Sequence, residues 1–202
     1  MTTTSATETV PATDEAKPGH VCPWWIGWLL ASPIRRLFDD AALLLEPLVR
    51  PGMTVLEPGP GMGYYSLKLA RLVGPTGRVV CVDLQPKMVA GLEKRALRAG
   101  LAARVEALAG TLDDPRLEPR TATFDLAVAI HMVHEVPDQE GFLRRIATLL
   151  RPGGRLLLVE PKGHVTQEGF DATVARAQAG GLRRVPPPAG RLGLTALLER
   201  PA

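Results

Sequence analysis

Long hydrophobic runs are missing from this sequence of 202 residues. Its most apolar stretch, from Trp24 to Ala31, falls far short of the roughly 18 residues that a transmembrane helix needs, and Pro33 and Arg35 close it. The N-terminus, MTTTSATETVPATDEAKPGH, lacks the basic start and the apolar core of a signal peptide. The sequence therefore predicts a cytoplasmic protein with no membrane association.

Cysteine and strong charge are scarce as well. Two lone cysteines, Cys22 and Cys81, make no disulfide framework, which favours a reducing compartment. The net charge is only +3 and no basic run exceeds a pair, so nucleic-acid binding has little support. No H-x-x-x-H or C-x-x-C spacing occurs, and no metal is expected. A hydrophobic content of 46% fits a globular domain with one core.

Three parts are expected along the chain. Residues 1–19 should form a flexible tail, residues 20–50 N-terminal helices that act as a lid and first packing layer, and residues 51–202 the main domain. Ser32 and Pro33 fit an N-cap followed by proline at the first helical position.

Within the main domain, short apolar strands alternate with helices. Strands are expected at 54–57, 78–83, 104–108, 124–130 and 155–160, and helices at 65–72, 86–99, 139–150 and 167–179. Strands that are apolar throughout and separated by helices indicate a parallel sheet covered on both faces. The ending differs, because 182–185 and 192–198, joined by the turn PPPAGR, are typical of an antiparallel hairpin.

A glycine-rich turn, Glu57-Pro-Gly-Pro-Gly-Met-Gly-Tyr64, joins the first strand to its helix. Such a turn lets a ligand approach the backbone closely beside the partly positive helix end. A dinucleotide fingerprint starting at Gly59 would need glycine at position 64, where Tyr64 stands. Asp83 ends the second strand, where its carboxylate can accept hydrogen bonds from ribose hydroxyls. The alternative is that Asp83 caps the next helix.

These pieces resemble the class I S-adenosylmethionine-dependent methyltransferases. The matching motifs are VLEPGPGMG, VVCVD, FDLAVAIHMVHEV and LLRPGGRLLLVEP, and the resemblance covers about residues 33 to 200. It implies an α/β fold with a Rossmann-like, doubly wound sheet, mostly parallel and ending in a C-terminal antiparallel hairpin. More narrowly, the chain is similar to small bacterial methyltransferases near the arsenite and ubiquinone-type enzymes.

The resemblance implies S-adenosyl-L-methionine as methyl donor and S-adenosyl-L-homocysteine as product. It places the three turn glycines at the methionine moiety, Glu57 near its ammonium, Asp83 at the ribose and Leu84 beside the adenine. After the third strand the family often has Gly-Asp, whereas this chain has Gly110-Thr111, so adenine is expected at the backbone of Thr111 and Leu112 or at Asp113. The full donor set is Glu57, Gly59, Gly61, Gly63, Asp83, Leu84, Gly110, Thr111, Leu112 and Ile130.

Histidines gather after the predicted strands that end at one rim. His131 and His134 follow the fourth strand and His164 follows the fifth, while Glu135 lies on the same rim. Ligands of open α/β sheets bind beyond the carboxyl ends of the strands. We therefore expect His134, Glu135, His164 and His131 to be catalytic; the alternative is that the histidines cap helices or stand in solvated loops.

The stretch HVCPWWIGWLLAS, residues 20–32, holds all three tryptophans. Because no long insertion is available to close the donor site, this stretch is expected to cover it, and aromatic faces suit a sulfonium cation. The expected acceptor pocket comprises His20, Cys22, Trp25, Trp28, Tyr64 and Glu160. A core helix that uses tryptophan as bulk is the alternative.

The sequence thus predicts methyl transfer to a small-molecule acceptor by a monomer or homodimer. A histidine, pKa about 6.5, matches a thiol near 8.5 better than an alcohol, so a thiol acceptor is favoured. O-, N- or metalloid methylation and a binding protein that senses the donor without turnover stay open. Arsenite is disfavoured because Cys81 lies within a predicted strand, which leaves Cys22 alone.

Overall fold

The computed structural model of the chain describes residues 44–187 and 193–202. The expectations for the tail, the lid and the stretch 20–32 fall outside these residues. The described strands are β1 (Thr54–Pro58), β2 (Arg78–Asp83), β3 (Val105–Ala109), β4 (Phe124–Ile130), β5 (Leu150–Glu160), β6 (Arg183–Val185) and β7 (Leu194–Glu199). The α-helices are α3 (Ser66–Leu72), α4 (Pro86–Arg98), α5 (Gln139–Leu149) and α6 (Gln167–Ala179), and short 3-10 helices are η2 (Ala102–Arg104), η3 (Pro115–Arg120) and η4 (Val133–Glu135).

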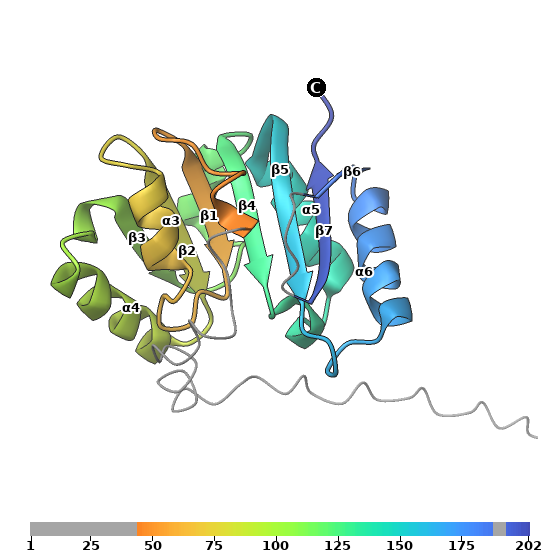
Figure 1. The fold of residues 1–202 in the computed structure, drawn as a ribbon, viewed down its shortest axis with the longest axis horizontal. Helices are drawn as coiled ribbons and strands as arrows, with labels where there is room; N and C mark the ends of the chain where they lie inside the picture. Colours follow the sequence, from red (N-terminus) through yellow and green to blue (C-terminus); the bar gives the residue numbers. More distant parts are fainter. Residues whose placement is uncertain (1–43, 188–192) are drawn as a thin grey trace, which may run out of the picture.

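The strands form a single sheet in the order β3-β2-β1-β4-β5-β7-β6 (Figure 1). Strands β1 to β5 are parallel, while β7 runs antiparallel to both β5 and β6. The predicted doubly wound sheet with an antiparallel ending is therefore confirmed. The strand order reverses between β1 and β4, and this is the position at which open α/β sheets bind their ligands.

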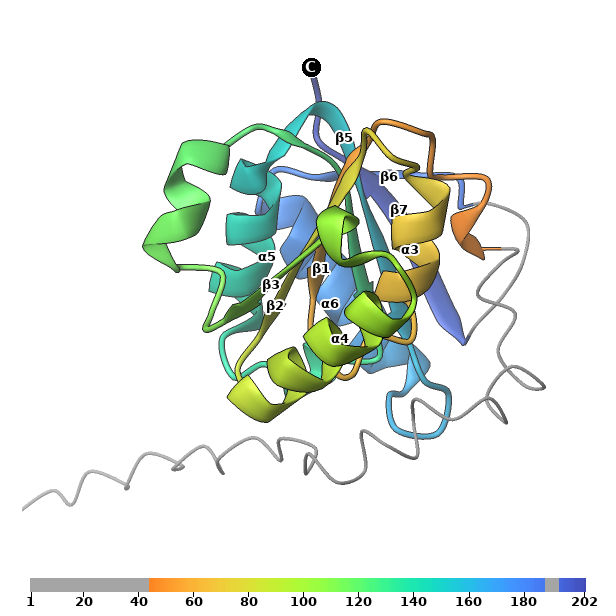
Figure 2. The same ribbon diagram turned by 90° about the vertical axis from the view of Figure 1, so that its left-hand side faces the viewer.

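Both faces of the sheet are covered, as the apolar strands require. Helices α3 and α4 pack on one face, together with Leu44 and Leu45, and α5 and α6 pack on the other (Figure 2). Alternate residues of each strand point to opposite faces, so Cys81 of β2 lies on the α3/α4 face whereas Val80 lies on the α5/α6 face.

The predicted strand and helix bounds agree with the structure to within one or two residues, with one exception. Strand β5 begins at Leu150 and not at Arg155, because Leu150 already pairs with Phe124 of β4 before a shift of register. The Pro-Gly-Gly segment thus lies within β5, at the shift of register, and proline and glycine are tolerated at such irregularities.

Among the described helices, none has both the length and the apolar character to cross a membrane.

Candidate active site

The candidate site lies at the carboxyl ends of the parallel strands, at the lower edge of the sheet in Figure 1. Here β1 ends at Pro58, β2 at Asp83, β4 at Ile130 and β5 at Glu160. Parallel strands bring these ends, which are far apart in the sequence, to one edge.

The glycine turn follows β1 and adopts backbone conformations that favour glycine. The φ angles are +64° at Gly59, +54° at Gly61 and +83° at Gly63. A side chain at Gly59 would meet Met132 and one at Gly63 would collide with Leu92, whereas none of the described residues lies within 4 Å of a side chain built at Gly61. The open side of the turn is therefore over Gly61.

Asp83 ties the end of β2 to this turn. Its Oδ2 accepts a hydrogen bond from the Gly61 amide at 3.1 Å, and its Oδ1 accepts one from the Gln85 amide at 2.9 Å. Burial raises the pKa of Asp83 and the charge of Glu135 adds to this, while the two backbone hydrogen bonds lower it. Asp83 does not cap α4, because Gln85 is the residue that precedes this helix and no side chain caps it; the bond to Gly61 instead holds the glycine turn.

Glu57 is buried behind the turn, with 3% of its surface exposed. The Cys81 thiol donates a hydrogen bond to its Oε2 at 3.4 Å. Burial raises the pKa of Glu57 to about 7, and Asp83 contributes to the rise, although hydrogen bonds from Ser66 and Cys81 lower it. A carboxyl of this kind can exchange a proton near neutral pH.

The end of β3 borders the same edge. The Gly110 amide donates to the Asp83 carbonyl at 2.9 Å, and the Thr111 hydroxyl accepts from the Asp113 amide at 3.2 Å. The side chain of Leu112 packs into the core and its carbonyl accepts from Arg145 at 3.0 Å. Leu112 therefore offers neither its side chain nor a free carbonyl to a ligand at this edge.

Leu84 and Ile130 differ in how far they are accessible. Leu84 follows Asp83 and is 60% exposed, which leaves an apolar surface beside that carboxylate. Ile130 is the last residue of β4 and is buried on the α3/α4 face.

His134 and Glu160 form a hydrogen-bonded pair between the loops that follow β4 and β5. The His134 Nδ1 lies 2.7 Å from Glu160 Oε2, and the His134 backbone amide donates to Glu160 Oε1 at 3.0 Å. Glu160 is 1% exposed, so both of its oxygens are committed to His134. The hydrogen bond that His134 donates to Glu160 raises the pKa of His134, and the charges of Glu160 and Glu135 add to the rise against the effect of burial.

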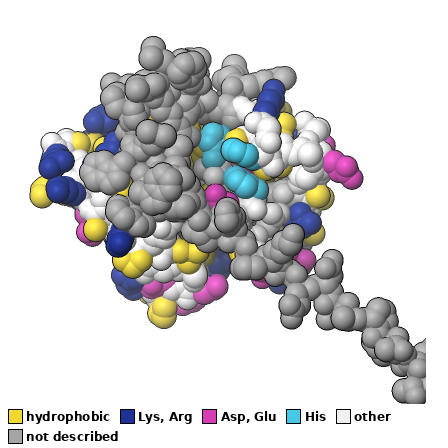
Figure 3. Space-filling view, turned by 90° about the horizontal axis from the view of Figure 1, so that it is seen from below, with side chains coloured by type: hydrophobic (Ala, Val, Ile, Leu, Met, Phe, Trp, Pro, Cys, Tyr) yellow, Lys and Arg dark blue, Asp and Glu magenta, His cyan; other side chains and the backbone are white. Residues whose placement is uncertain are grey.

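The other rim residues surround this pair. The ring of His164 stacks on that of His134, with centroids 6.3 Å apart and planes at 16°, and Glu135 Oε1 lies 4.0 Å from His134 Nε2. Figure 3 shows histidine side chains gathered on this face, next to an acidic side chain. His131 has a φ of +59°, and its amide donates to the Val159 carbonyl at 2.8 Å.

Of the expected acceptor pocket, the structure describes Tyr64 and Glu160. Tyr64 is half-buried in the glycine turn and packs edge-on against Tyr65, with ring centroids 5.0 Å apart. The other four residues, His20, Cys22, Trp25 and Trp28, lie outside the described part of the chain.

Two residues that hold the glycine turn were not predicted. Met132 packs against Gly59, and the Arg95 guanidinium of α4 donates to the Met62 carbonyl at 2.6 Å. Met132 stands inside the motif HMVHEV, so its position was a usable signal. Nothing in the sequence distinguishes Arg95 from the other basic residues of α4.

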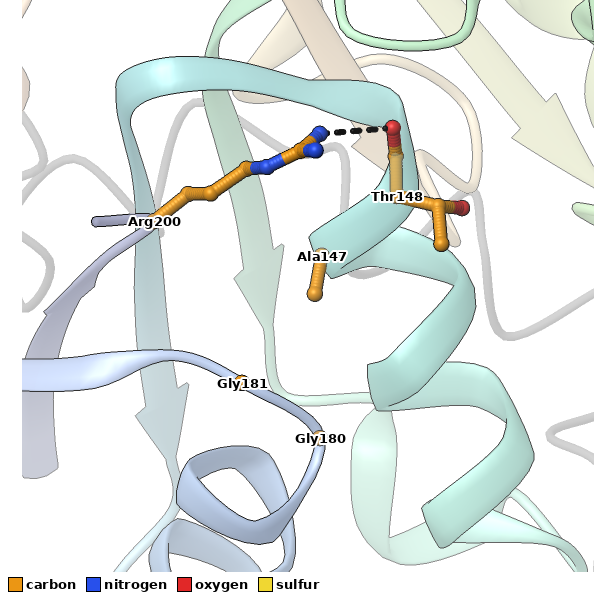
Figure 4. A pocket seen from close by; sticks show the side chains of 5 residues that line it. All are labelled: Ala147, Thr148, Gly180, Gly181 and Arg200. Atoms are coloured by element: carbon orange, nitrogen blue, oxygen red, sulfur yellow. Dashed lines mark hydrogen bonds between the residues drawn. The ribbon is translucent and has the colours of Figure 1, made fainter. Parts of the chain in front are cut away.

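A separate cavity of about 150 Å³ lies at the opposite edge of the sheet (Figure 4). It is lined by Ala147, Thr148, Gly180, Gly181 and Arg200. The Arg200 guanidinium donates to the Thr148 and Leu150 carbonyls and so satisfies the C-terminal end of α5. This cavity lies at the other end of the strands from the histidines, and Arg200 in its wall serves to satisfy the end of α5.

Within residues 44–187 and 193–202, no three histidine, cysteine, aspartate or glutamate side chains are grouped to hold a metal ion.

Comparison with known proteins gives one family. A model described as "Methyltransferase domain" matches residues 55–154. The ubiquinone/menaquinone biosynthesis C-methyltransferase UbiE of Pseudomonas fluorescens (strain Pf0-1) is 33% identical over 147 residues, which are 71% of this chain and 56% of that protein. The protein of the same name from Ectopseudomonas mendocina is 36% identical over 132 residues, 65% of this chain and 50% of that one. The chain thus spans about half the length of the curated relatives it matches.

Solved structures agree with the fold. A SAM-dependent methyltransferase from Aquifex aeolicus superposes with a TM-score of 0.76 at 22% identity, covering 89% of this chain and all of that one (100%). A putative S-adenosyl-L-methionine-dependent methyltransferase from Methanococcus maripaludis gives a TM-score of 0.72 at 15% identity, covering 96% and 98%.

Proposed function

The chain belongs to the class I S-adenosylmethionine-dependent methyltransferases, and we propose that it transfers the donor's methyl group to a small acceptor whose proton His134 removes. The observation that carries this proposal is the pairing of His134 with the buried carboxylate of Glu160 at the rim of the sheet. A histidine oriented by a buried carboxylate is an arrangement suited to general-base catalysis.

The residues around the glycine turn fit the donor. No described residue covers the turn at Gly61, so a ligand can approach the backbone there, and the Asp83 carboxylate beside it has lone pairs left for ribose hydroxyls. The exposed Leu84 supplies an apolar surface for adenine, and Glu57 a carboxyl for the ammonium group. When bound, the donor supplies a methyl group carried by its sulfonium sulfur. The rest of the donor leaves as a neutral thioether.

The geometry of His134 defines its part in the reaction. Because Nδ1 faces Glu160, the neutral ring carries its proton there and keeps the lone pair of Nε2 available. As the acceptor atom bonds to the methyl group, the acceptor's proton passes to Nε2. The imidazolium that results lies between two carboxylates, Glu160 and Glu135, which stabilise it.

An acceptor with an acidic proton suits this base. The raised pKa of His134 brings it closer to that of a thiol, near 8.5, so that proton transfer from a thiol to Nε2 is more favourable than to an ordinary histidine. A thiol is therefore the first acceptor class that we propose. The second is a carbon made nucleophilic by a neighbouring ionised hydroxyl, because the relatives named above are C-methyltransferases.

A screen with radiolabelled donor tests the proposed function. Purified protein is incubated with thiols, phenols, amines and metalloids, and label in the extracted product is counted. Transfer to thiols or to ring carbons of phenols is expected. Donor binding without transfer to any acceptor would favour the alternative, a protein that senses the donor.

Asp83→Ala should weaken donor binding by about 1–3 kcal/mol, because charge-assisted hydrogen bonds to the ribose are lost. Calorimetry with S-adenosyl-L-homocysteine measures this. Asp125→Ala is the matched control, since Asp125 also accepts a backbone hydrogen bond, from Thr54 at 2.8 Å, but at the opposite end of the strands. Binding of NADH and not of S-adenosyl-L-homocysteine by the unaltered protein would refute the donor assignment.

Gly61→Ala should weaken donor binding at least about tenfold, because the new methyl group enters the open space above the turn. Gly100→Ala controls for backbone strain: its φ is +68°, against +54° at Gly61, and its side is open too. Both changes should lower the free energy of unfolding by about 1–2 kcal/mol, measured with denaturant, but Gly100→Ala should leave donor binding intact. Unchanged affinity in Gly61→Ala would mean that the donor binds elsewhere.

A further inference from the structure

A small polar group is buried behind the glycine turn, on the α3/α4 face of the sheet. Glu57 of β1 is paired in register with Cys81 of β2, and Ser66 of α3 packs over them. Glu57 is 3% exposed, and the other two are fully buried. The proposed function uses Glu57, but it leaves Cys81 and Ser66 without a role.

Among residues 44–187 and 193–202, the groups that act on Glu57 are an acid and hydrogen-bond donors, with no cation. The groups that act on it are Ser66, Cys81 and Asp83, while β4, on the other side of β1, is apolar from Leu126 to Ile130. Arg95 of α4 reaches the glycine turn, but its guanidinium donates to the Met62 carbonyl. Burial without a partner cation therefore raises the pKa of Glu57 to about 7, so the carboxyl holds a proton in much of the donor-free protein.

Cys81 acts on this carboxyl as a hydrogen-bond donor and not as an acid. Burial raises the pKa of its thiol well above the ordinary value, and the charge of Glu57 raises it further. The S–H group is thus retained and points to Glu57 Oε2 at 3.4 Å. A hydrogen bond donated by a thiol in this way stabilises the ionised carboxylate and so lowers its pKa. The Ser66 hydroxyl is fully buried beside this pair and acts on Glu57 in the same sense, because it too favours the ionised carboxylate.

We propose that Cys81 is a positioning residue of the donor site: its thiol holds Glu57 for the ammonium group of the methyl donor, and donor binding expels the proton that Glu57 carries. This inference rests on the proposed function. The ammonium supplies the missing positive charge and forms a charge-assisted hydrogen bond with the carboxylate. The expelled proton passes to solvent, and no covalent bond other than the O–H bond of Glu57 is broken.

Calorimetric titration with S-adenosyl-L-homocysteine, which carries the same ammonium group, tests the inference. Titrations at several pH values are run in phosphate and in Tris, whose heats of ionisation differ, so the difference gives the protons released. About half a proton per ligand is expected at pH 7 and fewer above pH 8, and affinity should rise with pH up to about 8. Glu57→Gln should abolish the release, which assigns the proton.

Two substitutions at Cys81 give opposite expectations. Cys81→Val removes the hydrogen bond and should move the midpoint of the affinity profile to higher pH. Cys81→Ser replaces the thiol by a hydroxyl, which is a better hydrogen-bond donor, and should move the midpoint of the affinity profile to lower pH. Val79→Ala is the matched control, because Val79 is buried two residues earlier on the same face and is not among the groups that act on Glu57. It should lower stability without moving the midpoint.

The outcomes separate the two proposals. Binding without buffer dependence, or a midpoint that both Cys81 substitutions leave in place, overturns the inference while the proposed function stands. Failure of the unaltered protein to bind S-adenosyl-L-homocysteine at any pH overturns the proposed function and this inference together. Cys81→Ser changes a single atom, so this variant should fold and give a midpoint even if Cys81→Val does not fold.

Discussion

Replacing His134 with alanine is expected to lower turnover by about 10²–10⁴-fold while donor affinity changes little. The reason is that Nε2 of His134 receives the acceptor's proton, whereas the donor residues belong to the turn after β1 and the end of β2. The initial rate of transfer from labelled donor measures turnover, and calorimetry with S-adenosyl-L-homocysteine measures affinity. The loss should lie in kcat rather than in the KM for the donor.

Glu160→Gln and His164→Ala serve as graded controls. Glu160→Gln keeps the shape but removes the charge that raises the pKa of His134, so the acidic limb of kcat/KM should move to lower pH. In the unaltered protein that limb should lie above pH 6.5, since the neutral ring is the active form. His164 only stacks on His134, so His164→Ala should lower turnover less than the other two substitutions do. Full activity in His134→Ala at neutral pH would return this histidine to the solvated-loop interpretation.

Replacing Glu57 with glutamine should stabilise the donor-free protein at alkaline pH. Folding raises the pKa of Glu57 from 4.5 to about 7, mainly through burial, so the folded protein binds this proton more tightly than the unfolded chain. Stability is then greatest below pH 4.5 and is lost as the pH rises through 7. Glutamine cannot ionise, and the free energy of unfolding of Glu57→Gln relative to the unaltered protein should rise by about 2–3 kcal/mol between pH 5 and pH 8.

Denaturant unfolding at the two pH values measures the change, and subtraction removes every titrating group that both proteins share. Glu106→Gln is the control of opposite sign. Partial burial raises the pKa of Glu106, but Arg120 and Arg78 outweigh this and lower it, so this substitution should lose relative stability at pH 8. A difference for Glu57→Gln that is independent of pH would show that the carboxyl is ionised throughout.

The fold was predictable because its signals are local. Strands β2 and β4 are apolar runs bounded by charged or polar residues, and their predicted bounds are those of the structure. The start of β5 was missed because proline and glycine usually end a strand. Whether they do so here depends on the pairing of Leu150 with Phe124, which local sequence does not reveal.

The candidate site was predictable as a location but not as a set of contacts. The rule for strand ends brought His134, Glu135 and His164 to one rim, and the structure joins all three. The sequence did not reveal that both carboxylate oxygens of Glu160, a residue expected in the acceptor pocket, lie within hydrogen-bond distance of His134. That contact follows from the register of β4 and β5, which pairs Ile130 with Val159.

The contact of Cys81 with Glu57 could not be predicted from the sequence either. A cysteine within an apolar strand gives no sign of function, and the sequence assigned it none. Only the parallel register, which sets Cys81 beside Glu57 on the α3/α4 face, reveals that its thiol contacts a residue of the proposed donor site.

The position of β7 determines an order of events during synthesis. Strand β6 leaves the ribosome before β7, but in the sheet β7 lies between β5 and β6 and pairs with both. Until residues 194–199 have emerged, β5 retains an unpaired edge and β6 has no partner. An exposed edge of apolar residues is a template for association with other chains. Before residues 194–199 pair, this edge is therefore open to association with other chains, and the insertion of the single strand β7 closes it.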